Sequence, residues 1–147
     1  MPIKNYTTKV DSIQSVGEIQ AALVKAGASK IMVDYDNSCF PLAVTFALPT
    51  QGGLSPFTLI APVEGTMTVF NRQKVKTDRK QAERTAWRNV RDWVLAQLAY
   101  MEASNVEAAQ VFLPYLTNRD GQTLYQMYQN NQLMLGEGGT KNAEVHE

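Results

Sequence analysis

Five residues in the middle of the chain recur at helical spacing and combine positive charge with one aromatic ring. They are Lys80, Arg84, Trp87, Arg88 and Arg91. On a helix the four cations fall within an arc of about 80°, with the indole at its border. Guanidinium groups present a planar fork of donors that suits phosphate, and a neighbouring ring can stack on a base. The pattern predicts a surface that binds a phosphate-bearing ligand.

A basic connector, with Lys74 and Lys76, precedes this row and extends it. The segment from Arg72 to Asp92 holds eight basic and three acidic residues, although the whole chain has no net charge. The segment therefore carries +5 and the remainder −5. Two interpretations stay open. The cations bind phosphates, or they form a solvated helix face paired with the acidic residues elsewhere in the chain.

Residues that could support catalysis or metal binding are scarce. Cys39 is the only cysteine and His146 the only histidine, which excludes disulfides, thiolate zinc sites and histidine-based nucleophilic triads. The acidic pair Asp34 and Asp36 is typical of a solvated strand end and turn. We expect a protein that is not an enzyme and needs neither metal nor cofactor. Cys39, beside an aromatic residue, is expected to be a small buried side chain.

The first half of the chain predicts a sheet with one helix. Ser15 and Glu18 have the spacing of a capping box, and Gly27 ends the helix that they begin. Alternating or continuous apolar residues indicate strands on both sides of this helix. The predicted strands cover residues 6–10, 30–35, 40–48 and 54–61. The expected order is an N-terminal strand, a helix and a three-stranded antiparallel meander.

The second half predicts helices, so the fold class is α+β. A helix at 62–71 leads through the connector to one long basic amphipathic helix at about 79–102. Ser104 and Glu107 suggest a capping box for the next helix, and residues 123–129 predict a last short one. We expect a single domain over residues 1–135 and a disordered polar tail over residues 136–147.

An aromatic group near the end of the predicted domain has two interpretations. Its members are Phe112, Pro114, Tyr115, Tyr125 and Tyr128. Helical spacing favours a core between the last helices and the long one, and the alternative is a ligand-stacking wall or a dimer contact. The apolar surface of the meander and of two tryptophans on one helix predicts a homo-oligomer.

Neither a membrane span nor a secretion signal is visible. The longest apolar run, Phe40 to Leu48, is far shorter than the ~20 residues that cross a bilayer. The first residues, Met1 to Asn5, lack the charged-then-apolar order of a signal peptide. We expect a cytoplasmic protein with no membrane partner.

Several segments together resemble those of small proteins encoded by phages and mobile elements. They are residues 81–93, 111–116, 123–125, 30–32 and 56–59, so the resemblance extends from about Tyr6 to Tyr128. It implies a bacterial host cell as the setting. It brings no activity and no functional residue.

Two functions fit the basic row in that setting. The first is a non-catalytic accessory protein that binds nucleic acid, most simply a single strand. The second is an anti-defence protein that sequesters a nucleotide immune signal or inhibits a host defence protein. Both would use arginines for phosphates and an aromatic ring for a base.

Overall fold

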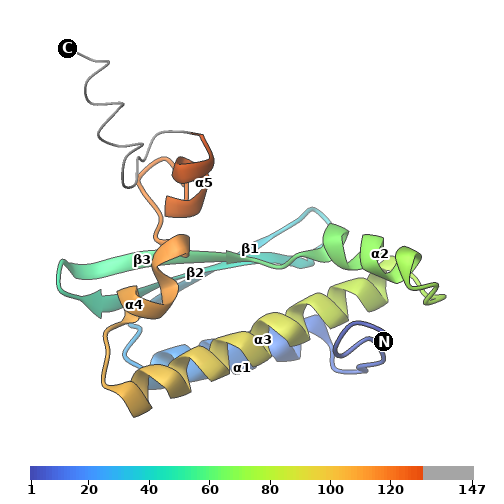
Figure 1. Cartoon of the computed structure of the whole chain (residues 1–147), viewed down its shortest axis with the longest axis horizontal. Helices are drawn as coiled ribbons and strands as arrows, with labels where there is room; N and C mark the ends of the chain where they lie inside the picture. Colours follow the sequence, from blue (N-terminus) through green and yellow to red (C-terminus); the bar gives the residue numbers. More distant parts are fainter. Residues whose placement is uncertain (131–147) are drawn as a thin grey trace.

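The computed structural model describes residues 1–130 and places a layer of helices under a three-stranded sheet (Figure 1). The elements are α1 (Ser12–Lys25), β1 (Lys30–Tyr35), β2 (Pro41–Thr50), β3 (Gly53–Ile60), α2 (Val63–Arg72), α3 (Arg79–Ser104), α4 (Ala108–Phe112), the 3-10 turn η1 (Leu113–Tyr115) and α5 (Leu124–Gln129). The α+β class, the helix before the meander and the long helix in the second half are confirmed. The predicted tail at 136–147 and His146 lie outside the described residues.

The sheet is a simple antiparallel meander in the order β1-β2-β3. Phe46 on β2 pairs with Ile31 on β1 and with Phe57 on β3, so these three side chains share the face that meets the helices. Asp36 makes the first turn, since its carboxylate accepts hydrogen bonds from the backbone N–H groups of Ser38 and Phe40. The predicted solvated turn is confirmed there.

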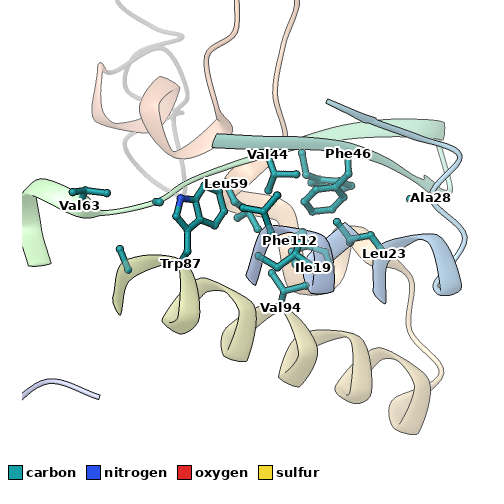
Figure 2. Packing of buried hydrophobic residues seen from close by; sticks show 14 of the residues in the cluster. Ile19, Leu23, Ala28, Val44, Phe46, Leu59, Val63, Trp87, Val94 and Phe112 are labelled. Atoms are coloured by element: carbon teal, nitrogen blue, oxygen red, sulfur yellow. The ribbon is translucent and has the colours of Figure 1, made fainter. Parts of the chain in front are cut away.

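Helices α1 and α3 lie side by side against one face of the sheet, and α5 lies on the opposite side (Figure 1). In the core, the rings of Phe46, Phe57 and Phe112 have centroids 5.3 to 5.8 Å apart. Figure 2 shows Phe112 and Trp87 reaching toward the side chains of the sheet. Each fully buried phenylalanine contributes roughly 1.5–3 kcal/mol of transfer free energy, so this cluster joins the helical half to the meander.

The predicted aromatic group divides between the core and the surface. Phe112 is fully buried, and Trp93 packs edge-on against both Phe112 and Tyr115. Tyr125 and Tyr128 are exposed and contact each other, with centroids 6.0 Å apart. The core interpretation therefore holds for Phe112 and not for the two tyrosines of α5.

The strand predicted at residues 6–10 is absent, because side chains of α3 hold this segment as irregular backbone. The Gln81 amide donates hydrogen bonds to the carbonyls of both Tyr6 and Thr8, and the Thr85 hydroxyl donates to the carbonyl of Asn5. Asn5 has a φ of 64°, which interrupts an extended run. The carbonyls that would form a strand ladder are thus bonded to a helix.

Neither predicted capping box forms at its helix. Helix α1 begins three residues before Ser15, which lies fully buried on its inner face. Ser104 is the last residue of α3, and Asn105 ends that helix in the left-handed conformation. The Glu107 carboxylate accepts instead from the backbone N–H of Gln51. The capping box that does form is that of α5, between Thr123 and Gln126.

Cys39 is exposed, which corrects the expectation of a buried side chain. It lies in the β1–β2 turn with a φ of 69°, and its N–H donates to the carbonyl of Asp36. In the described part of the chain, no helix is long and apolar enough to span a membrane.

Candidate functional site

The connector between α2 and α3 has a defined backbone that holds its lysines in solvent. Lys74 takes the left-handed conformation that ends α2, and the N–H of Val75 bonds back to the carbonyl of Phe70. Val75 packs against the core cluster. At the other end, the Asp78 side chain caps α3 by accepting from the backbone N–H of Gln81. Lys74 and Lys76 are therefore exposed on an anchored loop.

Five cations around this loop form what we call the connector surface. They are Arg72, Lys74, Lys76, Lys80 and Arg84. The first four are exposed, and none of the five forms an ion pair within residues 1–130. Arg84 is half-buried, and its guanidinium donates twice to the neutral side-chain oxygen of Gln81. These five side chains are consequently not held in ion pairs by the described part of the chain.

The other half of the basic row holds α3 against α1. Glu18 on α1 accepts from Arg88 at 2.9 Å and from Arg91 at 2.8 Å. Only 11% of the Arg88 side chain is exposed. The hydrogen bond from Gln14, together with those two arginines, lowers the pKa of Glu18 below its ordinary value. These two predicted binding residues are committed to an intramolecular pairing.

Asp92 extends that pairing to the segment before α1. Its carboxylate accepts from Lys4 at 2.7 Å, from Asn5 at 2.9 Å and from Arg91 at 3.0 Å. Burial alone would raise its pKa, but the three hydrogen bonds outweigh burial and lower the pKa to about 2. Asp92 therefore stays ionised at neutral pH and binds three partners from two parts of the chain.

Trp87 belongs to the core rather than to the surface. Its side chain has no exposed area, and its Nε1–H donates to the carbonyl of Pro41 at 2.9 Å. Figure 2 shows the ring pointing up from α3 toward the sheet. With the fold intact the indole has no face on which a base could stack. The aromatic part of the predicted site is not available at this position.

A hollow of about 200 Å³ lies beside the connector surface, where the start of α1 meets α3 and β2. Its walls include Lys80 and Arg84 together with the half-buried ring of Phe40. Two carboxylates, from Asp11 and Glu83, also line it. Burial raises the pKa of Glu83, and the nearby cations Arg79, Lys80 and Arg84 act in the opposite direction. Phe40 thus takes the place beside the cations that the sequence suggested for Trp87.

Arg79 stands next to this hollow but is paired. Its guanidinium contacts the carboxylate of Glu64 on α2, and it lies 3.8 Å from Glu83. The hydrogen bond to Glu64 is the main cause of the raised pKa of Arg79. Arg79 therefore links α2 to α3 through an exposed ion pair and adds little free charge.

A larger hollow, of about 540 Å³, lies near the other end of α3, between that helix and α1. Its lining is mainly aliphatic, with Lys25 and Glu102 as the charged members. A single lysine opposed by a glutamate does not make a phosphate site. Within residues 1–130 no three His, Cys, Asp or Glu side chains group closely enough to hold a metal ion.

Comparisons of the chain with protein-family models, with curated proteins and with solved structures found no match.

The sequence did not identify the partner of the basic row. Glu18 lies 70 residues before Arg88 and had been assigned to a capping box. Its place on α1 offered one usable signal, because it lies about 100–140° round the helix from the apolar side chains of Ile19 and Leu23 and so flanks the stripe that faces the core. Phe40 carried no comparable signal, since its position beside Lys80 arises only from tertiary packing.

Proposed function

We propose that this protein is a non-catalytic accessory protein that binds single-stranded nucleic acid along the connector surface. The observation that carries the proposal is the set of five cations that form no ion pair within residues 1–130, beside paired cations on the same helix. Phosphate binding requires positive charge that is free to exchange counterions for a ligand. The connector surface supplies that charge, and the α1–α3 pairing does not.

The neighbouring polar groups support an anionic ligand. The surface lies at the start of α3, a 26-residue helix whose N-terminus carries a partial positive charge. Lys80 and Arg84 stand one helical turn apart on that first part of α3. Beside them, the partly exposed ring of Phe40 is available for contact with a base. These groups lie in one continuous region around the α2–α3 connector.

The size of the hollow favours a strand laid across the surface over an enclosed nucleotide. Pockets that enclose a small ligand usually measure about 300–1,000 Å³, and this one measures about 200 Å³. It has room for one phosphate or part of one base. Sequestering a nucleotide signal would require walls that one copy of the chain does not provide here.

The test is fluorescence anisotropy with a labelled single-stranded oligonucleotide at several salt concentrations. We expect binding at low salt that weakens steeply as salt rises, with a slope near 0.7 for each phosphate contact. The double variant Lys74→Gln/Lys76→Gln should bind severalfold more weakly and lower that slope by about 1.4, because two contacts are lost. Both side chains are exposed, so folding should be unaffected.

The matched control is Lys25→Gln/Arg119→Gln, which removes the same charge from exposed positions elsewhere. This variant should keep wild-type affinity and slope. Absence of binding by the wild-type protein at low salt would contradict the proposal. Equal weakening by both double variants would also contradict it, because net charge rather than this surface would then govern binding.

A further inference from the structure

Strand β1 leaves one edge of the sheet open. It pairs with β2 on one side only, and no strand of the described chain covers its other side. An open edge presents unpaired N–H and C=O groups and readily accepts another strand unless something guards it. The outer edge of β3, in contrast, is partly closed by bridges and hydrogen bonds from residues 116 and 117.

Side chains on β1 alternate between two faces. Ile31 and Val33 face the helices and pack against the core, yet they are only partly buried. Lys30, Met32 and Asp34 face the other side and are exposed. Met32 is 57% exposed, and neither Lys30 nor Asp34 forms an ion pair with a described residue.

The hydrogen-bond phase of the sheet shows which backbone groups reach the open edge. The Pro56 carbonyl accepts a hydrogen bond from the backbone N–H of Thr117, which lies outside the sheet. Because the backbone groups of successive residues point to opposite sides of a strand, the N–H and C=O of Phe57 point toward β2. The hydrogen bond from the Ala61 N–H to the Leu42 carbonyl agrees with this alternation. The same alternation along β2 directs the backbone N–H and C=O of Thr45 toward its partner Met32 on β1.

By the same alternation, the backbone groups of Ile31 and Val33 point away from β2, to the open edge. These two residues would therefore form the hydrogen bonds with any added strand.

We propose that two copies of this protein pair through β1, antiparallel, with the two-fold axis at Met32. Ile31 of each copy then exchanges backbone hydrogen bonds with Val33 of the partner subunit. Lys30 faces the partner's Asp34, and this pair occurs twice. Met32 meets its own equivalent on the axis. Two three-stranded sheets become one sheet of six strands.

The register follows from the faces and the charges. The apolar faces of the two copies lie on the same side of the joined sheet only if the two-fold axis passes through a residue. An axis between two residues would shift the pairing by one residue and place apolar side chains opposite polar ones on the other face. An axis at Ile31 would set Lys30 against the partner's Met32, and an axis at Val33 would set Met32 against the partner's Asp34. Charges on an edge strand usually repel a second copy. In this strand, opposite signs placed symmetrically about Met32 make the edge self-complementary.

The helix layer adds apolar area on the same side. Glu18 marks the side of α1 that faces α3, and exposed Val24 lies about 120° round the helix from it, on the side away from α3. Helix α3 reaches the β3 end of the sheet, since Trp93 packs on Tyr115 in the turn beside β3. The side of α1 that carries Val24 is therefore turned toward the β1 side of the sheet. A second copy joined at β1 would approach this side chain.

The first experiment is light scattering across a protein concentration series. We expect a mass of twice 16.4 kDa at high concentration. Lys30→Glu alone places like charges together twice and should weaken dimerisation by about tenfold or more. Lys30→Glu/Asp34→Lys restores opposite signs and should recover the dimer. A monomer at every concentration overturns the proposal, as does a double variant weaker than the single one.

The second experiment tests the register by oxidation in a Cys39→Ser background. Met32→Cys should form a disulfide-linked dimer, since Cα atoms of such an axial pair lie about 4.5 Å apart. The control Leu54→Cys, exposed on β3, should remain a monomer. Equal cross-linking at both positions would overturn the register. Neither experiment involves an oligonucleotide, so its outcome is independent of the proposed nucleic-acid binding.

Discussion

Arg88 on α3 and Glu18 on α1 are joined at 2.9 Å across a separation of 70 residues. The contact is mostly shielded from water on the arginine side, where 11% of the side chain is exposed. A charge in that position is costly unless it is paired. The pair therefore makes the packing of α1 on α3 depend on one carboxylate, and this dependence can be measured.

Arg88→Ala should lower the free energy of unfolding by about 1–3 kcal/mol, because Glu18 loses its most shielded partner and keeps Arg91 and Gln14. A double-mutant cycle that combines Arg88→Ala with Glu18→Gln, measured by urea denaturation, gives the coupling free energy between the two side chains. The control Lys80→Ala, at an exposed cation without an ion pair, should change stability by less than about 0.5 kcal/mol. Additive effects of the two cycle mutations would show that the pair contributes nothing.

Asp92 should make stability depend on pH in the acid range. Its pKa is about 2 in the folded protein and 3.8 in its ordinary state. Its contribution is therefore fully present above pH 3.8 and disappears as the pH falls through 2. At pH 7, Asp92→Asn should cost about 1–2 kcal/mol after allowance for solvent screening.

Urea denaturation of Asp92→Asn and wild type at several pH values measures this contribution. The difference between the two proteins should shrink between about pH 4 and pH 2. A difference that stays constant over that interval would mean that the carboxylate is not held by Lys4, Asn5 and Arg91.

Trp87→Phe should destabilise the protein without affecting a ligand. The change removes part of a fully buried ring and leaves the Pro41 carbonyl without its donor. We expect a loss of about 2–3 kcal/mol in urea denaturation. Oligonucleotide affinity of the folded variant should equal that of wild type. Weaker binding by a fully folded variant would indicate that the indole contacts the ligand.

Ser15→Ala should stabilise the protein. Ser15 Oγ is buried and has no hydrogen-bond partner, and the residue lies within α1. Alanine removes the unsatisfied hydroxyl and has the higher helix propensity, so a gain of about 0.5–1.5 kcal/mol is expected. Thermal denaturation measures it, with exposed Ser29→Ala as the neutral comparison. A lower melting temperature would indicate that the hydroxyl makes a bond.

Local patterns were sufficient to predict most elements of the fold. The alternation of residues 30–35 and the apolar run at 40–48 predicted β1 and β2, and both exist within two residues of those bounds. The segment at 6–10 has the same β-branched composition but is irregular, because Gln81 and Thr85 bind its backbone. Composition cannot show that a helix 75 residues later will take those hydrogen bonds.

The candidate site was predictable only in part for a similar reason. Charge spacing correctly grouped Lys80, Arg84, Arg88 and Arg91 on one helix. It could not distinguish cations that face α1 from those that face water, because that distinction depends on the position of Glu18. An aromatic residue at the border of a basic row was equally ambiguous, and Trp87 lies on the inner side of it.

The bonds that secure residues 3–8 have a consequence for the order of folding during translation. Ile3 is bonded to Gln73, Lys4 and Asn5 to Asn89 and Asp92, and Tyr6 and Thr8 to Gln81. A ribosome makes residues 3–8 about seventy to ninety positions before these partners, at roughly 5–20 residues per second. The nascent segment therefore waits several seconds without its native contacts. It reaches its final conformation only after the first half of α3 has left the exit tunnel.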